Sequence, residues 1–290
     1  MLYTQLRSFH AVAAEGGFTA ASKVLHVGQP TITSQVKALE EQFRVELFHR
    51  HGRQVEMTSA GRDLFTVTRK MLSFEAEAID LLKALGGLET GSLKIGAVGP
   101  YHVTEMLSAF GERFPGLKVQ VNQGNSREML RQLQGFAVDI AVLDNVEPDE
   151  RLYTLPVGRH PISAFVNRDH RWFKRRGITL AELAGERLIL REQGSTTRRL
   201  IEQAMAQAGL SAEPAMEIGS REAVWMAVEK GLGVGIVNAV EFVPHPRLKL
   251  LPITDATLTS EAQVVCLAER QASPLIRAFL SVIGARTQEL

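Results

Sequence analysis

One uninterrupted helical segment constrains the fold of this chain most. Between Ser59 and Leu85 there is no proline and, after Gly61, no glycine. Apolar residues recur there in steps of three and four, as Leu64, Val67, Met71, Phe74, Ala78, Leu81 and Leu85. This is the spacing of a coiled-coil seam, on a helix roughly 40 Å long at about 1.5 Å per residue. A stripe of this kind needs a partner, so we expect a dimer formed through this helix.

The glycines that follow this helix divide the chain. Gly86, Gly87 and Gly91 end the helical pattern, because glycine loses more backbone entropy in a helix than other residues do. We therefore expect an N-terminal domain over residues 1–58, a dimerisation helix and hinge over 59–91, and a larger domain over 92–290. A chain of 290 residues, 45% of them hydrophobic, is long enough for two cores.

The composition excludes several functional classes. No apolar run approaches the roughly 18 to 20 residues of a membrane-spanning helix, and the first ten residues lack the apolar core of a secretory signal. We therefore expect a cytoplasmic protein with no membrane partner. A single cysteine, Cys266, excludes a disulfide framework. Nucleophile, metal-ligand and phosphate-loop motifs are absent from the sequence, so we expect no metal, no cofactor and no enzymatic activity.

Three short helices are expected before residue 45: Thr4–Ala14, a second one beginning at Phe18 with Thr19 as its cap, and 30–42. In the second helix we expect Ala21, Val24 and Leu25 to face the core of this domain. The buried stripe of the third helix is expected to consist of Ile32, Val36, Leu39 and Phe43, which are spaced by four, three and four residues.

The other face of the third helix suggests contact with DNA. A net charge of +1 gives no such indication by itself, so the hypothesis depends on where side chains lie. Thr31, Ser34, Gln35 and Lys37 form a face without acids, as a helix in a major groove requires. Two short alternating stretches within residues 47–58 then predict a hairpin that turns at His51 and Gly52.

From residue 92 the sequence alternates between strands and helices. This rhythm predicts βαβ units and a parallel sheet, in two similar lobes that form a clamshell with a ligand cleft between them. We place lobe I at about 92–161 and 266–290, and lobe II at about 162–265. The expected strands are 93–98, 117–121, 138–143, 162–166, 187–190, 215–218, 234–237 and 264–268, and the expected helices are 102–114, 126–134, 196–208, 221–230 and 274–285.

A set of fixed spacings near the N-terminus resembles the LysR-type transcriptional regulators. The matching residues are Gly17-Phe18-Thr19, Ala21, Leu25, Gln29-Pro30, Gln35, Leu39-Glu40, Leu47-Phe48, Thr58 and Gly61. The resemblance implies a two-domain α+β chain. Its N-terminal part would be a winged helix-turn-helix with a long dimerisation helix, and its C-terminal part a two-lobed α/β effector domain like the periplasmic binding proteins. It also implies that dimers assemble into tetramers, with double-stranded DNA, a small-molecule effector and RNA polymerase as partners.

Carried over by position, the resemblance implies a set of DNA-binding residues. On the third helix and its start these are Gln29, Pro30, Thr31, Thr33, Ser34 and Lys37, and on the wing they are Arg50 and Arg53. Guanidinium groups on a wing suit phosphates or a minor groove. Three positions depart from the family pattern: Gly28 stands where a capping Ser is common, Ser22 replaces a small Ala, and Ser34 stands where an Arg often occurs.

A finer resemblance concerns the branch of this family that is associated with aminoethylphosphonate catabolism. It is carried by Arg50-His51-Gly52-Arg53, Gly99-Pro100-Tyr101 and residues 194–200. It implies an organophosphonate effector such as 2-aminoethylphosphonate.

Residues at the expected cleft suit an anionic effector. Helix N-termini carry free N–H groups and a partial positive charge, and hydroxyl and guanidinium groups gather there in this sequence. The candidate effector-binding residues are Pro100, Tyr101, Ser126, Ser195, Thr196, Thr197, Arg198 and Ser220. For each hydroxyl, simple helix capping is the alternative. Because Arg198 and Arg199 are adjacent, they cannot share a helix face, and one of them is expected at the surface or in a salt bridge.

These features together predict a DNA-binding regulator whose effector shifts the population of lobe arrangements. The alternative is a cytoplasmic small-molecule-binding protein whose N-terminal module serves protein interaction. The residues are compatible with activation as well as repression, and with a dimer as well as a tetramer.

Overall fold

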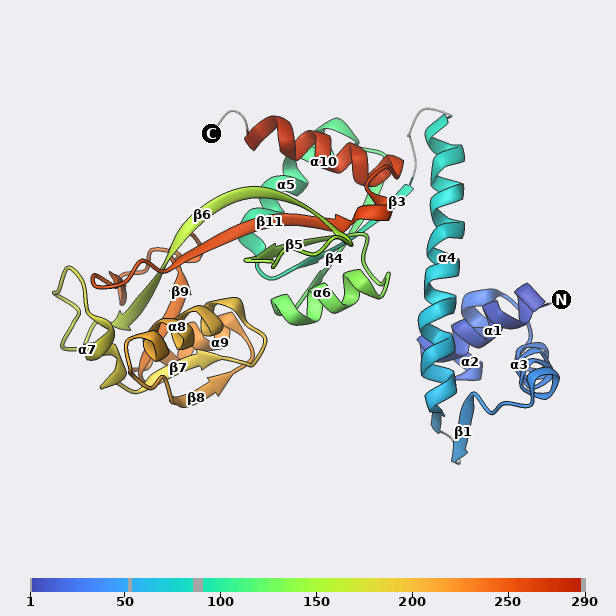
Figure 1. The fold of residues 1–290 in the computed structure, drawn as a ribbon, viewed down its shortest axis with the longest axis horizontal. Helices are drawn as coiled ribbons and strands as arrows, with labels where there is room; N and C mark the ends of the chain where they lie inside the picture. The colour runs from blue at the N-terminus through green and yellow to red at the C-terminus, as the bar shows by residue number, and fades with distance from the viewer. Residues whose placement is uncertain (1, 52–53, 86–90, 288–290) are drawn as a thin grey trace. The chain divides into compact units, whose positions relative to one another are not determined.

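The computed structural model describes residues 2–51, 54–85 and 91–287. The chain forms two compact units. One consists of Met1–Gly86 with Gly135–Ala137, and the other of Gly87–Gln134 with Val138–Leu290. Figure 1 shows the elements of both units.

Three helices build the core of the first unit: α1 (Leu2–Glu15), α2 (Phe18–Leu25) and α3 (Gln29–Phe43). Ile32, Val36 and Leu39 are buried as expected. Phe43 is 55% exposed and Val24 is 53% exposed, so both inward assignments were wrong. Phe43 is the last residue of α3, and the helix ends at Arg44, where φ is positive.

The start of α2 and the end of α3 differ from what the sequence predicted. Gly17, not Thr19, is the N-cap residue of α2, and the Thr19 hydroxyl instead donates to Gln29 Oε1 at 3.2 Å. The Glu40 carboxylate at the far end of α3 accepts the N–H groups of Leu47 and Phe48 at 2.8 and 3.3 Å. This acid therefore fixes the start of the hairpin to the helix.

The expected hairpin is present. Strands β1 (Phe48–His51) and β2 (Gln54–Met57) pair in antiparallel register, with Phe48 opposite Met57. Residues 52 and 53 of the turn lie outside the described residues.

Helix α4 spans Ser59–Leu85, the bounds expected from the sequence. The hydroxyl of Thr58 donates to the Glu46 carbonyl at 2.7 Å and accepts the Gly61 N–H at 3.0 Å. A Cβ at position 61 would lie 2.2 Å from the carbonyl oxygen of Leu47. Only glycine permits this approach, which explains physically why Thr58 and Gly61 occur three residues apart.

The apolar residues of α4 have two different environments. Ala60, Leu64 and Phe65 pack against the core of α1–α3. Farther along, the exposed fractions of Val67 and Leu81 are 61% and 50%. These two positions of the expected seam are therefore largely exposed in a single protomer.

The second unit contains one long mixed sheet with two lobes. In lobe I the strand order is β4-β3-β5-β11-β6, and in lobe II it is β6-β9-β7-β8 with β10 paired to β6. The strands are β3 (Gly91–Ala97), β4 (Leu117–Gln123), β5 (Ile140–Asp144), β6 (Leu152–Asn167), β7 (Leu188–Arg191), β8 (Pro214–Ile218), β9 (Val234–Asn238), β10 (Leu248–Pro252) and β11 (Thr259–Leu267).

The expectation of a parallel sheet was only partly correct. β3, β4 and β5 are parallel, as are β7, β8 and β9. β6, β10 and β11 join them in antiparallel pairs. Strand β10 and the first half of β6 were not expected. In β6, Pro156, Gly158 and Pro161 interrupt the apolar alternation on which strand prediction depends.

Helices cover both faces of lobe I (Figure 1). α5 (Pro100–Arg113) and α10 (Pro274–Thr287) pack together over β3, and α6 (Ser126–Gln134) packs on β5. Their core contains Ile95, Phe110, Val142 and Phe279, all nearly fully buried.

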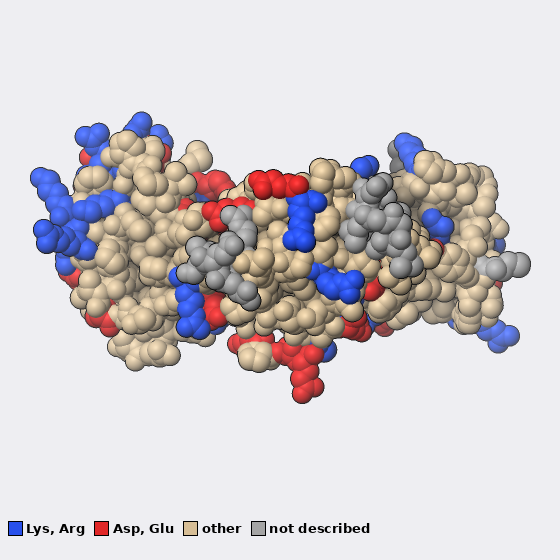
Figure 2. All heavy atoms as spheres, turned by 90° about the horizontal axis from the view of Figure 1, so that it is seen from above, with Lys and Arg blue, Asp and Glu red and all other residues tan. Residues whose placement is uncertain are grey.

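Lobe II has a separate core around β7 and β9. Its helices are α7 (Leu180–Ala184), α8 (Thr196–Gln207) and α9 (Arg221–Glu229). Figure 2 shows Lys and Arg side chains gathered over the α7 end of this lobe, where Arg168, Arg171, Lys174 and Arg176 are exposed. Within the described part of the chain, no helix is both long and apolar enough to cross a membrane.

Candidate DNA-contacting helix and effector pocket

The polar face of α3 is available to a partner. Gln29, Pro30, Thr31, Ser34 and Lys37 are exposed. This arrangement follows from the sequence, because the buried positions Ile32, Val36 and Leu39 occupy the opposite side of the same helix.

Several of these side chains are already positioned by neighbours. Half-buried Thr33 donates from its hydroxyl to the Gln29 carbonyl at 3.0 Å. Lys37 Nζ lies 3.4 Å from Glu41 Oε1, in a pair exposed enough to be readily exchanged for a phosphate. Gln35 accepts the hydroxyl of buried Ser8 and therefore serves the core.

The wing residues remain predictions. Arg50 belongs to β1, but its side chain lies outside the described part, and Arg53 lies outside the described residues altogether.

Between the lobes lies a pocket of about 470 Å³, which we call the effector pocket. It is lined by residues 126, 127, 130, 143–149, 152, 193–196, 198, 199 and 202. A volume of this size suits a small organic molecule.

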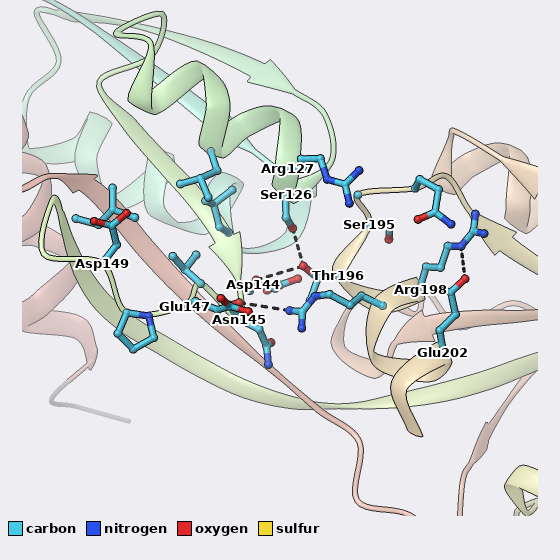
Figure 3. A pocket seen from close by; sticks show the side chains of 18 residues that line it. Ser126, Arg127, Asp144, Asn145, Glu147, Asp149, Ser195, Thr196, Arg198 and Glu202 are labelled. Atoms are coloured by element: carbon cyan, nitrogen blue, oxygen red, sulfur yellow. Dashed lines mark hydrogen bonds and ion pairs between the residues drawn. The ribbon is translucent and has the colours of Figure 1, made fainter. Parts of the chain in front are cut away.

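Two helix N-termini meet at this pocket. Ser126 begins α6 in lobe I, and Thr196 begins α8 in lobe II. The hydroxyl of Thr196 lies 2.8 Å from that of Ser126 and 3.3 Å from the Asp144 carbonyl (Figure 3). The expectation that these two segments converge is thus matched by their geometry.

Further hydrogen bonds cross between the lobes beside this pair. Asn125 Nδ2 donates to Glu192 Oε1 at 3.0 Å, and the Arg127 N–H donates to the Gly194 carbonyl at 3.4 Å. Gly194 has φ of +101°, and a Cβ there would lie 2.9 Å from Asn125 Oδ1. Glycine is therefore required where the two loops touch.

The two adjacent arginines of α8 have different environments. The Arg198 side chain is 7% exposed and pairs with Glu202 at 2.6 Å (Figure 3). Its second ion-pair partner is Glu217, at 2.5 Å. It also donates to the Arg191 carbonyl at 2.9 Å. Both arginines line the pocket, but within the described part of the chain Arg199 forms no such ion pair and donates to the Asn145 carbonyl at 3.4 Å. Arg198 is thus the salt-bridged member of the pair.

Of the remaining expected effector residues, Ser195 lies at this pocket and the other four do not. Ser195 lines it and makes no side-chain cap bond. Thr197 lines a separate cavity of about 10 Å³ inside lobe II. Ser220 caps α9 by accepting the Ala223 N–H at 3.2 Å, which is the capping alternative. Pro100 and Tyr101 begin α5 and do not contribute to the pocket lining.

Sequence reasoning missed a charged cluster at the lobe junction. Arg221 Nη2 lies 2.9 Å from Glu241 Oε2 and 3.3 Å from the Val98 carbonyl of lobe I. Burial raises the pKa of Glu241 to about 7. Arg221 directly follows Gly219 and Ser220 at the start of α9. This helix start is a local feature of the sequence from which a functional role for Arg221 could have been predicted. Glu241 lies in the short helix η1 (Ala239–Glu241), and no pattern in the sequence indicates its burial.

Two family models match this chain. Residues 3–62 match the bacterial regulatory helix-turn-helix protein, lysR family, and residues 86–288 match the LysR substrate binding domain. The chain belongs to the LysR family of bacterial transcriptional regulators. As a LysR-type regulator it combines a DNA-binding domain with a small-molecule effector domain, and the family consists of regulators, not enzymes.

Curated relatives of this LysR-type chain are named as transcriptional regulators, one of them of the RuBisCO operon. The RuBisCO operon transcriptional regulator of Allochromatium vinosum is 32% identical over 81% of this chain and 78% of its own length. CbbR of Xanthobacter flavus is 31% identical over 96% of this chain and 86% of its own. CmpR of Synechocystis is 28% identical over 98% and 95%. None of these three names refers to phosphonates.

Solved full-length LysR structures share the fold. A full-length OxyR variant from Pseudomonas aeruginosa superposes with a TM-score of 0.76 at 22% identity, over 98% of this chain and 94% of that chain. CbnR superposes with a TM-score of 0.73 at 22% identity, over 99% of both chains. CbnR has also been solved with its target DNA. At these identities the likeness concerns the fold alone.

Proposed function

We propose that this LysR-type regulator reads operator DNA with the polar face of α3 and the wing, as a dimer formed through α4, and is controlled by a small anionic effector bound in the effector pocket. The observation that carries the effector assignment is the meeting of Ser126 and Thr196 from the two lobes. A ligand that replaces this contact touches both lobes at once and biases their arrangement.

The anionic class is supported by the groups around this contact. Arg127 and Arg199 line the pocket together with the N-termini of α6 and α8. These groups favour a carboxylate, phosphate or phosphonate. Asp144, Glu147 and Asp149 also line the pocket and favour a ligand that carries an amine or hydroxyl as well. 2-Aminoethylphosphonate has this character, although the relatives give it no support.

The roles of individual residues follow from their contacts. We assign Thr196, Ser126, Ser195 and Arg199 to ligand binding. Arg198 positions the first turn of α8 through Glu202 and Glu217. The coupling of lobe arrangement to the assembly and to RNA polymerase is proposed by analogy with the family.

The effector assignment is tested by calorimetric titration of the full chain with 2-aminoethylphosphonate, a panel of phosphate esters and hydroxycarboxylates, and glycine as control. We expect selective binding that Arg199→Gln weakens at least tenfold. Lys118→Gln, on exposed β4, is the matched control and should leave affinity unchanged. Binding that survives both Arg199→Gln and Thr196→Val would reject this pocket.

The DNA assignment is tested with duplexes selected from a randomised pool by the wild-type protein. Arg53→Ala should weaken binding to every sequence and lower the slope of log affinity against log salt by about one. Ser34→Ala should relax base preference and leave the slope unchanged. A changed preference with an unchanged slope in Arg53→Ala would contradict these roles.

A further inference from the structure

A basic surface lies at the α7 end of lobe II, where Figure 2 shows Lys and Arg side chains gathered. It is built from the loop 168–176, between β6 and α7, and from residues 247–249 at the start of β10, which pairs with the end of β6. We call this surface the basic patch, and its cations are Arg168, Arg171, Lys174, Arg175, Arg176, Arg247 and Lys249. None of these residues lines the effector pocket, so the patch is not explained by ligand binding there.

The loop that carries most of the patch is fixed by its own contacts. Trp172 is buried, and its N–H donates to His170 Nδ1 at 3.2 Å. The Phe173 N–H donates to the His170 carbonyl at 2.9 Å, and the Arg168 N–H donates to the Arg247 carbonyl at 2.8 Å. The cations therefore project from a folded surface, and little backbone entropy is lost when they bind a partner.

Carboxylates neutralise only part of the patch. Four of its arginines form ion pairs: Arg168 with Asp169, Arg171 with Glu186, Arg175 with Glu182 and Arg247 with Glu229. Within the described part of the chain, Lys174, Arg176 and Lys249 have no carboxylate at ion-pair distance, and the first two are exposed. The patch therefore carries an excess of positive charge that a polyanion can neutralise.

The existing ion pairs can be exchanged for contacts with a polyanion. Arg168 and Asp169 lie 3.9 Å apart, with 66% and 83% of their side chains exposed. The side chains of Arg171 and Arg247 are exposed as well. Exposed ion pairs contribute little to stability, so a phosphate can take the place of a carboxylate without a large loss of stability.

The composition of the patch favours a phosphate backbone over a protein surface. Protein interfaces have an apolar centre, and none of the exposed large apolar side chains of the described residues belongs to the loop 168–176 or to 247–249. Trp172 is buried, and Lys249 Nζ lies 6.0 Å from the ring centroid of half-buried Phe173, so little aromatic surface is open to unpaired bases. An arginine-rich surface of this kind suits the phosphates of double-stranded DNA.

The DNA-reading part of the chain has little positive charge of its own to add to affinity. Residues 1–60 contain six Lys and Arg, five Glu and no Asp. Affinity for DNA rises steeply with the number of phosphates that a protein neutralises. A second basic surface on the same chain adds such contacts, and a duplex already held by α3 is present at a high local concentration.

We propose that the basic patch of lobe II binds the phosphate backbone of double-stranded DNA outside the segment that α3 reads. Phosphate contacts position a protein and add affinity but carry no sequence information. The inference therefore rests on the proposed reading of operator DNA by α3, which decides where on a duplex the patch acts.

The test compares two duplexes that contain the same selected operator, one ending at its edges and one extended by about 20 base pairs on each side. Binding of the full chain is measured by fluorescence anisotropy over a range of salt concentrations. Lys174→Gln/Arg176→Gln should weaken binding to the long duplex at least fivefold and lower the slope of log affinity against log salt by about two. Binding to the short duplex should be unchanged, because the phosphates that the patch contacts are missing from it.

Arg113→Gln/Lys118→Gln is the matched control, because it removes the same two charges from exposed positions of lobe I. It should leave binding to both duplexes unchanged. Equal losses in the two double variants, or an unchanged salt slope in Lys174→Gln/Arg176→Gln, would overturn the proposal. Unchanged DNA binding by that variant together with altered transcription from the operator would assign the patch to an acidic protein partner instead.

The two proposals fail separately. If α3 does not read the operator, the wild type binds operator and scrambled duplexes equally well. The difference between the two double variants on long DNA can still be measured in that case, since phosphate contacts do not depend on sequence.

Discussion

Single residues fix how the elements of this chain join, and Gly61 is the clearest example. Its missing side chain lets α4 begin against the Leu47 carbonyl, while Thr58 links the same turn to Glu46. The expectation of a glycine here came from family resemblance, and its physical reason became visible only from the backbone contact.

We expect Gly61→Ala to destabilise the N-terminal unit. The added methyl group would lie 2.2 Å from a backbone oxygen, and relief of that clash costs about 1–3 kcal/mol. Gly111→Ala, within α5 and with nothing within 4 Å of its Cβ, is the control. It should raise stability by about 0.5–1 kcal/mol. Denaturant melts followed by circular dichroism measure both, and equal effects of the two variants would refute the explanation.

The Glu241 carboxyl predicts a pH dependence of stability. Its pKa is raised by burial from an ordinary 4.5 to about 7, so the folded state holds its proton more tightly than the unfolded state. The resulting stability is fully present below about pH 4.5 and is lost as the pH rises through 7. Relative to Glu241→Gln, the wild type should therefore lose up to about 3 kcal/mol between these limits.

Melts of both proteins at a series of pH values test this difference. The lowered pKa of His102 acts in the opposite direction, because its contribution is lost as the pH falls from 6.5 to about 4. It is present in both proteins and cancels in the comparison. A difference between the two proteins that does not change with pH would contradict the raised pKa of Glu241.

At the scale of elements, α4 carries the strongest prediction about assembly. Val67 and Leu81 are 61% and 50% exposed, on a helix whose first turns pack on the core. An exposed apolar stripe of this kind indicates an interface.

We expect Leu81→Glu to shift the protein from dimer or larger species towards monomer at micromolar concentration, because a carboxylate in the seam must be desolvated on association. Thr66→Glu adds the same charge outside the seam and should leave the mass unchanged. Sedimentation over a range of concentrations measures both. A wild-type mass in Leu81→Glu would exclude this seam as the interface.

Most elements were predictable from the sequence, and the failures have physical causes. α4 and α6 matched to the residue because heptad spacing and clear end signals are local. Strand β10 and the first half of β6 were not predicted, because their pairing partners are distant in sequence. In the candidate site, Ser126 and Thr196 could be expected from helix starts. Glu241 could not be, since its burial depends on packing by η1 and α9.

At the scale of the whole effector unit, the lobes are held by polar contacts that sequence patterns do not reveal. Thr196 alone supplies two contacts to lobe I, to the Ser126 hydroxyl and the Asp144 carbonyl. Arg221 supplies another through the Val98 carbonyl.

We expect Thr196→Val to loosen the closed arrangement while keeping the side-chain shape. Loss of these contacts, at about 1 kcal/mol net, should speed hydrogen exchange at the Arg127 amide, which bonds to Gly194 across the lobes, by about fivefold. Thr104→Val removes a hydroxyl that bonds only within α5 and serves as control. Unchanged exchange in Thr196→Val would show that the hydroxyl does not hold the lobes together.

The pairing of β6 with β11 also has a consequence for how the protein is made. Lobe II is one continuous stretch between these two strands, and β11 must return to lie between β5 and β6. On the ribosome, which releases the chain from its N-terminus, lobe II can complete its core before β11 has emerged. Until then β5 presents an unpaired edge, which other nascent chains can join. Translation pauses shortly after lobe II should therefore increase aggregation of this protein, and chaperones that shield strand edges should act on lobe I.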